Sequence, residues 1–295
     1  MRVLIYGAGV IGCLYATLFS KAGFDTTIYA RGRRLESFKQ NGLLYFKNKK
    51  IKKVKVNIID KVEANDIYDF VFLTVKSNQV HTALEELKNN NSPNIVTMLN
   101  TLEKYNTWEE ICGKGRIIPA FPGAGGSFEG NILNAKLTPS IIQATTFGEI
   151  NGGKSERLLQ LASIFKRSHI PYKIEKDMHA WQLCHLAMIV PIADAYYEAG
   201  VPEKAGEDKE LMRKTAISIK KNLDSLCKLG VTLTPKKMKV LYRLPVGILR
   251  IGLRFTFQSK FGNTFMCQHS MKALDEMREL HNQFYSYIGS GGVRN

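Results

Sequence analysis

Three glycines near the start of the chain have the spacing of a phosphate-binding turn. Gly7, Gly9 and Gly12 form the pattern G-x-G-x-x-G directly after the short apolar run 2–6. In such a turn the first glycine permits a sharp bend, the second lets a pyrophosphate approach the backbone, and the third lets the next helix pack on the strand. Because the pattern stands between a predicted strand and a predicted helix, we favour a dinucleotide site over an ordinary glycine-rich turn.

The helix expected after the turn supplies the other half of this site. It begins at Val10 and Ile11 and ends at Gly23, and a second strand is expected over 26–30. The free N–H groups at the start of a helix, together with the positive end of its dipole, attract an anion. We therefore expect Val10 and Ile11 to lie against the pyrophosphate.

The residue after the second strand selects the cofactor. A chain that binds NAD usually has Asp or Glu there, about 20 residues on, to hold the ribose 2′-hydroxyl. This chain has Arg31, and no carboxylate follows it before Glu36. A guanidinium group suits a 2′-phosphate through its charge and its forked hydrogen bonds. The sequence therefore predicts NADP(H) with Arg31 as the main contact, while Arg33 and Arg34 either assist or only solvate a helix start.

Two polar residues follow strands that should be neighbours in one sheet. Lys76 ends the buried strand expected over 68–75, and Asn100 ends the one over 94–99. Open α/β sheets bind ligands at the carboxyl ends of their strands. Lys76 can contact the cofactor or a substrate carboxylate, and Asn100 can hold the nicotinamide ribose or the substrate. Each alone could be a solvated loop lysine or a turn asparagine, but on adjacent strand ends they favour function.

The order of elements predicts an α/β fold with an N-terminal Rossmann-type dinucleotide-binding domain, followed by an all-α domain. We expect the first domain over 1–174, a helical domain for substrate binding or dimerisation over 175–289, and a disordered tail over 290–295. The first domain should also hold strands at 42–46 and 54–58 around a basic turn, strands at 116–121, 144–150 and 171–174, a helix at 155–165, and a glycine cluster at 122–127 that is either a wall of the cleft or a flexible loop.

Beyond residue 177 the apolar spacing becomes helical. One segment, 246–255, is both basic and amphipathic, and for it we favour a domain or subunit interface over a membrane surface. The other predicted helices are a buried one over 179–197 broken at Pro191, one over 207–229 capped by Gly230, one opening at Thr234-Pro235 that Pro245 either kinks or ends, and a final one over 264–287.

Composition narrows the class of partner. The 295 residues are 44% hydrophobic, which suits a large core, and no stretch is apolar for long enough to cross a bilayer. The chain opens directly in a strand, so we expect no secretory signal peptide. Five scattered cysteines show neither C-x-x-C nor a zinc spacing, so we expect a cytoplasmic protein without a bound metal.

The net charge of +16 is spread along the chain, and no nucleic-acid motif accompanies it. Such a charge suits an anionic cofactor and an anionic substrate, and we expect no nucleic acid as a partner.

Taken together, these motifs resemble the ketopantoate reductase family. The resemblance is carried by the glycine pattern, Arg31 after the second strand, a strand ending in Val75-Lys76 with Gln79 three residues on, a strand ending in Asn100, and a helical second half. Members of that family are NADPH-dependent 2-dehydropantoate 2-reductases. The resemblance implies NADP as cofactor, a 2-oxo acid as the small-molecule substrate, and a place for Lys76 and Asn100 in the cofactor and substrate cleft.

The second half departs from the family pattern where its proton donor should be. The family has a helix reading W-x-K-L-x-x-N, whose lysine protonates the keto oxygen. Here the match begins at Trp181, and the lysine position falls on Gln182 or Leu183, neither of which is an acid. We predict His185 as the donor, with His179 as the alternative, because imidazole titrates near neutral pH. The other reading of His185 is a hydrogen-bonded core histidine.

Other assignments stay open at this stage. The family's late glutamate, which binds the substrate hydroxyl, falls near Glu276 or Glu279. The chain can be a ketopantoate-type reductase, a relative with a rebuilt pocket for another carbonyl compound, or an NADP-binding sensor without chemistry. The substrate and the oligomeric state, a homodimer included, are also open.

Overall fold

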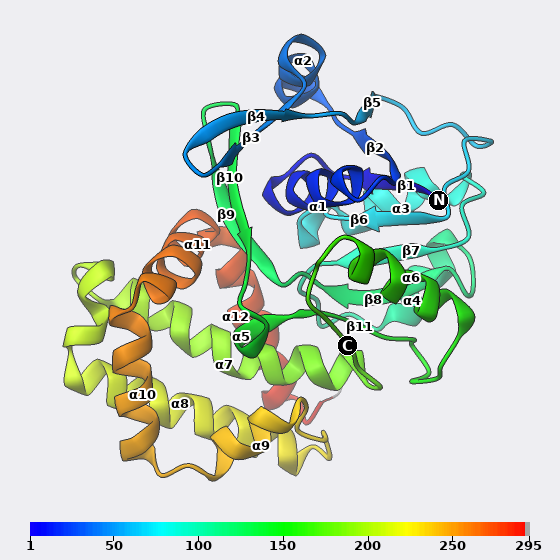
Figure 1. The fold of residues 1–295 in the computed structure, drawn as a ribbon. Coiled ribbons are helices and arrows are strands. Elements are labelled where there is room, and N and C mark those ends of the chain that lie inside the picture. The colour runs from blue at the N-terminus through cyan, green and yellow to red at the C-terminus, as the bar shows by residue number, and fades with distance from the viewer. Residues whose placement is uncertain (293–295) are drawn as a thin grey trace. The chain divides into compact units, whose positions relative to one another are not determined.

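The computed structural model describes residues 1–292, and the chain divides into two compact units. The first spans Met1–Met178 and the second starts at His179. The first is an α/β unit and the second is helical (Figure 1), so the predicted fold class is confirmed. The predicted tail at 290–295 lies partly outside the described residues, since only 290–292 fall within them.

An eight-stranded sheet forms the centre of the first unit (Figure 1). Its order is β12-β11-β8-β7-β6-β1-β2-β5, and the six strands from β8 to β5 run parallel. This is the 3-2-1-4-5-6 order of a Rossmann sheet, in which the strand order reverses between β1 and β6. The strands are β1 (Arg2–Tyr6), β2 (Asp25–Tyr29), β5 (Asn57–Ile59), β6 (Phe70–Leu73), β7 (Ile95–Met98), β8 (Ile117–Phe121), β11 (Thr145–Phe147) and β12 (Tyr172–Ile174).

Helices cover the two faces of this sheet because successive strand residues point to opposite sides. Ile5 of β1 packs in a cluster with Phe19 of α1 and Phe165 of α6. The next residue, Tyr6, reaches Glu86 of α3 instead. The helices are α1 (Val10–Lys21), α2 (Gly32–Asn41), η1 (Ser77–Gln79), α3 (Val80–Lys88), α4 (Tyr105–Cys112), α5 (Ser140–Gln143) and α6 (Glu156–Arg167). The helices α1 and α6 were predicted, whereas α4 and α5 were not.

A second, four-stranded sheet corrects two predictions. Its order is β4-β3-β10-β9, formed by β3 (Leu43–Lys47), β4 (Lys50–Val54), β9 (Ala124–Glu129) and β10 (Ile132–Leu137). The glycine cluster at 122–127 is therefore not a flexible loop, because most of it is strand β9, while its role as a wall of the cleft stays a prediction. Gly126 has φ +152° there, and a Cβ on it would lie 2.3 Å from the Asn134 carbonyl oxygen. Its lack of a side chain lets β9 and β10 approach each other.

The strand predicted at 54–58 was also wrong. The chain forms β4 from Lys50 to Val54, and only 57–59 continue as β5 at the edge of the large sheet. Lysines are depleted in strands generally, which hid β4. However, β4 is an edge strand, where exposed lysines are common, and its one buried residue, Val54, pairs with Leu43.

The second unit consists of helices (Figure 1). Helix α10 packs on α8, and the ring of Phe257 at its end stacks on Tyr196 of α7 at 4.5 Å. Lys220 of α8 donates from Nζ to the carbonyls of Tyr242 and Leu244, at the end of α9. The elements are α7 (Met178–Glu198), η2 (Pro202–Glu207), α8 (Lys209–Lys228), α9 (Lys236–Arg243), α10 (Val246–Gln258), η3 (Gly262–Cys267), α11 (Gln268–Lys272) and α12 (Leu274–Gly289).

Pro191 does not break α7, contrary to the prediction. The helix runs through it from Met178 to Glu198. A proline has no N–H, so the carbonyl four residues earlier, at Ala187, loses its helical partner. That carbonyl accepts a hydrogen bond of 3.2 Å from Nδ2 of Asn222 in α8, a side chain that is 3% exposed. A buried amide therefore replaces the missing backbone donor.

The final helix predicted over 264–287 is three pieces. A π-helical segment, η3, leads into α11, and Ala273 (φ −113°, ψ 35°) separates α11 from α12. The Ser270 carbonyl, which an unbroken helix would pair with the N–H of residue 274, accepts instead from Tyr197 Oη at 2.8 Å. This contact with α7 competes with the helical hydrogen bond at the break.

Replacing Asn222 should destabilise the protein through the Ala187 carbonyl. We expect Asn222→Leu, a change of similar size, to lower the free energy of unfolding by about 1–3 kcal/mol, because a buried acceptor loses its partner. Urea denaturation monitored by circular dichroism measures the change. In a Pro191→Ala background residue 191 has its own N–H, so the same substitution should cost less. Equal losses in both backgrounds would contradict this account.

Candidate active site

The glycine turn is clamped onto the end of the neighbouring strand β6. Thr74 donates from its backbone N–H to the Tyr6 carbonyl at 2.9 Å and from Oγ1 to the Gly7 carbonyl at 2.9 Å. A Cβ on Gly12 would lie 2.1 Å from the Gly7 carbonyl oxygen and 2.5 Å from Thr74 Oγ1. Only glycine fits at position 12, and the start of α1 is thereby fixed at the point where the strand order reverses.

The N-terminus of α1 is open to a ligand. Gly9 is its N-cap, no side chain caps the helix, and its first turn contains no acidic residue. A Cβ on Gly9 would meet nothing nearer than the Thr74 carbonyl oxygen at 4.0 Å. The N–H groups of Val10 and Ile11 belong to this first turn, both residues being partly exposed. This turn therefore has the features of an anion-binding helix start.

Arg31 lies in a polar cluster at the ends of β1 and β2. Its Nη1 is 3.2 Å from Glu86 Oε1, in an ion pair where the two side chains are 55% and 38% exposed. Glu86 Oε2 accepts hydrogen bonds from the hydroxyls of Tyr6 and Tyr29. The two tyrosine rings, opposite each other in the β1–β2 register, are 4.5 Å apart. A carboxylate therefore does lie beside Arg31, but it comes from α3.

The tyrosine hydroxyls in this cluster stay protonated. Burial, followed by the hydrogen bond to Glu86, raises the pKa of Tyr6 far above its ordinary value. Burial and the Glu86 charge also raise the pKa of Tyr29. Both hydroxyls therefore donate to Glu86, which leaves Oε1 facing the Arg31 guanidinium. The cluster holds Arg31 at the end of β2 through an ion pair that a competing anion can open.

Lys76 and Asn100 both follow strands of the large sheet, as predicted. Lys76 is exposed three residues after the end of β6, where its backbone N–H faces Gln79 Oε1 at 3.4 Å. Asn100 is 8% exposed, and its Oδ1 accepts no hydrogen bond from any residue between 1 and 292. A buried amide oxygen without a protein donor fits a ligand hydroxyl or amide. The first unit thus holds the glycine turn, Arg31, Lys76 and Asn100 at the carboxyl ends of β1, β2, β6 and β7.

The residues around the expected proton donor lie on helix α7 of the second unit. His185 is 8% exposed, and its ring stacks on Trp181 one turn earlier, with centroids 5.2 Å apart. Gln182 and Leu183, the two candidates for the family's lysine position, are both buried. His179 makes an edge contact with the ring of Tyr287.

An acid–base pair that the sequence did not suggest joins α7 to α12. Nδ1 of His281 lies 3.0 Å from both carboxylate oxygens of Asp194, and both side chains are partly exposed. Burial raises the pKa of Asp194 although His281 opposes the shift. Glu276 and Glu279 also lie on α12, where Glu276 is half-buried, while Glu279 is exposed and accepts from Gln283 at 2.9 Å.

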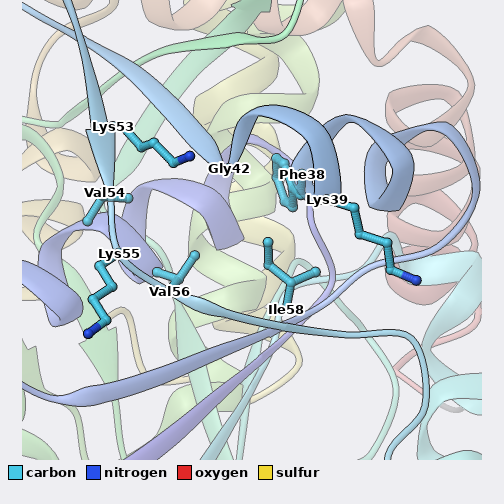
Figure 2. A pocket seen from close by; sticks show the side chains of 8 residues that line it. All are labelled: Phe38, Lys39, Gly42, Lys53, Val54, Lys55, Val56 and Ile58. Carbon is cyan, nitrogen blue, oxygen red and sulfur yellow. The ribbon is translucent and has the colours of Figure 1, made fainter.

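A cavity of about 400 Å³ in the first unit lies away from these residues, between α2 and the β4–β5 segment. In Figure 2 Lys53 reaches toward Gly42, whereas Lys39 and Lys55 point away from the centre. Lys39 is paired with Asp60 at 3.0 Å. Lysines are the only titratable side chains in the lining of this cavity and no acid–base pair lies among them, so we do not assign the cavity to chemistry. Its lining is Phe38, Lys39, Gly42, Lys53, Val54, Lys55, Val56 and Ile58.

Comparison with known proteins identifies the family. The family model of ketopantoate reductase PanE/ApbA matches residues 3–153. The chain belongs to this family. The match covers the glycine turn, Arg31, Lys76 and Asn100, and ends before the helical unit begins.

Curated relatives of this family member are distant. The 2-dehydropantoate 2-reductase of Pyrococcus horikoshii is 24% identical over 190 residues, which cover 62% of this chain and 58% of that protein. The enzyme of the same name from Aquifex aeolicus is 27% identical over 187 residues, covering 61% and 57%. The chain thus matches less than two thirds of the length of these relatives.

Solved structures confirm the fold over the whole length. A 2-dehydropantoate 2-reductase from Geobacter metallireducens has a TM-score of 0.70 at 17% identity, covering 100% of this chain and 95% of that one. A D-mandelate dehydrogenase solved with NADH has a TM-score of 0.69 at 12% identity, covering 98% of this chain and 99% of that one.

No helix described between residues 1 and 292 is long and apolar enough to span a membrane.

Sequence reasoning missed Thr74, Glu86 and the Asp194–His281 pair. Thr74 directly follows β6, so its place at a strand end was a usable signal. Glu86 is one of several polar residues on an amphipathic helix, and nothing in its spacing marks it. Asp194 and His281 are 87 positions apart and meet only through helix packing.

Substitution of Gly12 should affect stability, whereas substitution of Gly9 should affect cofactor binding. Gly12→Ala should lower the free energy of unfolding by about 1–3 kcal/mol, because the new Cβ collides with the Gly7 carbonyl. Gly9→Ala should leave stability unchanged, since that Cβ has room, yet weaken NADPH binding by filling the space above the helix start. Thermal denaturation and fluorescence titration with NADPH measure the two effects. A stable Gly12→Ala variant, or undiminished affinity in Gly9→Ala, would contradict this division.

Proposed function

We propose that this chain is an NADPH-dependent reductase that converts a 2-oxo acid, ketopantoate or a close relative, into the 2-hydroxy acid. The observation that carries the proposal is the cofactor cradle of the first unit: an uncapped α1 start with open space at Gly9, and Arg31 exposed at the end of β2. A phosphorylated dinucleotide supplies the two anionic groups that these two places suit. Family membership of the same segment supports the proposal.

The residues present fit this cofactor. Val10 and Ile11 would donate backbone N–H groups to its pyrophosphate, and Arg31 would bind the 2′-phosphate on release from Glu86. Asn100 Oδ1, buried without a donor from residues 1–292, would accept from the nicotinamide ribose or the substrate. Lys76 would hold the substrate carboxylate or the cofactor through its charge.

Bound NADPH supplies the hydride for the carbonyl carbon. The protein must then orient the substrate and deliver a proton to the carbonyl oxygen, so that a hydroxyl forms. Lys76 and Asn100 orient the substrate, and His185 donates the proton to its carbonyl oxygen. An imidazolium can release a proton near neutral pH and be reprotonated from solvent.

The assay is direct. Purified protein is mixed with NADPH and ketopantoate, and absorbance is followed at about 340 nm, where reduced nicotinamide reports. Loss of absorbance with formation of pantoate supports the proposal. NADPH binding without turnover of ketopantoate or related 2-oxo acids would overturn it.

A second candidate function has one observation in its favour. Gln182 and Leu183, where the family lysine would fall, are buried in α7 and neither is an acid. This favours a rebuilt pocket for another carbonyl compound, or a sensor that binds NADP without chemistry. Turnover of a carbonyl panel identifies the first, and NADPH binding with no turnover of any substrate identifies the second.

Substitutions of Arg31 and Glu86 should change the preference for NADPH over NADH in opposite directions. Arg31→Ala should weaken NADPH binding by about tenfold or more while NADH binding stays the same, because only the 2′-phosphate uses the guanidinium. Glu86→Gln should tighten NADPH binding by up to about fivefold, the upper range for an exposed ion pair, since it removes the competing carboxylate. Isothermal titration calorimetry with both cofactors measures these ratios.

Neighbouring residues supply the matched controls for these two variants. Glu85→Gln makes the same charge change as Glu86→Gln at an exposed position nearby and should leave the NADPH/NADH ratio unaltered. Arg33→Ala shows whether Arg33 assists Arg31, since it makes the same charge change two residues along the chain. If Glu86→Gln weakens both cofactors equally, Glu86 only supports the local structure.

His185→Ala should lower kcat without changing NADPH affinity. We expect a loss of about 100-fold or more, the usual contribution of a general acid. Steady-state kinetics across pH and a cofactor titration test this. His179→Ala is the comparison, and a larger kcat loss there would transfer the role to His179.

A further inference from the structure

Helix α10 of the second unit carries apolar side chains on two opposite faces. Leu249, Leu253 and Phe257 are buried against the rest of the unit. Ile248, Ile251 and Phe255 are 54%, 49% and 69% exposed. A helix turns by about 100° per residue, so the second set lies diametrically opposite the first. We call Ile248, Ile251 and Phe255 the outer stripe of α10.

Cations border the outer stripe. Arg250 and Arg254 lie along one side of it, and together with Lys209, Met212 and Ile251 they line a cavity of about 360 Å³. Neither arginine takes part in an ion pair with any residue between 1 and 292. Glu210 lies near enough to Arg250 to respond to its charge, but its ion pair is with Arg213 at 3.0 Å. The cavity therefore presents unpaired positive charge beside apolar side chains.

The surrounding sequence strengthens this charge. From residue 225 to residue 274 the chain contains nine lysines and arginines and no aspartate or glutamate. Lys236 and Lys239 of α9 are exposed, and Val240 beside them is 60% exposed. Apolar side chains facing outward among cations are the composition of a helix that lies in a membrane interface.

We propose that α10 docks this protein on an anionic lipid surface, in place of the domain or subunit interface that the sequence favoured for 246–255. Ile248, Ile251 and Phe255 enter the interfacial layer, and the cavity lined by Lys209, Arg250 and Arg254 receives a phosphate headgroup. The arginines gain from the negative surface potential, and the outer stripe gains from leaving water.

The charges disfavour two other occupants. A two-fold contact with a second copy would place the same patch on both sides, so Arg250 and Arg254 would face their own counterparts. Segment 225–274 holds no acid, and Glu210, the acid near Arg250, is already paired with Arg213. A nucleic acid would use the cations, but it has no partner for an aliphatic stripe at their centre. An anionic bilayer suits both the charge and the stripe.

The test uses the whole protein and vesicles of phosphatidylcholine with or without phosphatidylserine. Co-sedimentation should show binding only to the vesicles with phosphatidylserine, and binding should fall as salt is raised. Phe255→Ser should weaken binding at least about tenfold because it removes the largest inserted group. Arg250→Gln with Arg254→Gln should weaken it by about fivefold for each charge removed.

Matched variants distinguish docking through α10 from a general effect of surface charge or surface hydrophobicity. Leu159→Ser removes a similarly exposed apolar residue on α6, and Lys154→Gln with Lys166→Gln removes two exposed charges, one just before α6 and one in its last turn. Both should bind vesicles like the unmodified protein, and circular dichroism should show every variant folded. Equal binding to neutral vesicles, or full binding by Phe255→Ser, would overturn the proposal.

Three further outcomes would also overturn it. Release from vesicles by inorganic phosphate alone, with Phe255→Ser unaffected, would mean a free-anion pocket. A dimer in analytical ultracentrifugation that Phe255→Ser dissociates, with no vesicle binding, would mean that a second copy covers the stripe. Binding to RNA that the arginine substitutions abolish, with no vesicle binding, would mean a nucleic-acid surface.

Discussion

The contact between the glycine turn and Thr74 fixes the position of the α1 start, on which the candidate site of the first unit depends. Because position 12 has no side chain, the start of α1 can approach the end of β6 closely enough for Thr74 to hold the Gly7 carbonyl. That approach sets the positive end of the helix where the strand order reverses. The ends of β2, β6 and β7 then bring Arg31, Lys76 and Asn100 to the same edge of the sheet. A small change in this contact would move the helix start away from all three.

Polar contacts between elements determine the local geometry at two further places in the molecule. Glu86 gathers the Tyr6 and Tyr29 hydroxyls and the Arg31 guanidinium, so a flexible arginine is held in one place before any ligand arrives. Tyr197 takes the Ser270 carbonyl and separates α11 from α12. In both places a hydrogen bond between elements decides a feature that local propensity leaves open, since an unmet buried group is costly.

The same distinction explains how far sequence reasoning reached. The glycine spacing and the apolar strands follow local rules, so the Rossmann unit and its strand-end residues could be predicted. Strand β4 could not, because its lysines are acceptable only at an edge, and edges are known only once the sheet is assembled. Continuity of α7 through Pro191 depends on Asn222, which is distant in sequence. Glu86 and the Asp194–His281 pair likewise arise from packing. Predicted roles for Lys76, Asn100 and His185 stay predictions.

Because of the contact between the Pro191 turn and Asn222, the order in which these two residues are replaced during evolution affects the stability of the intermediate chains. A chain that first lost the proline would regain a backbone donor at that point, and position 222 would then be free to drift. A chain that first lost the asparagine would carry a less stable helix until the proline also changed. Among relatives, an amide at the position of Asn222 should therefore accompany proline at 191 more often than chance allows, and the pair should be inherited as a unit.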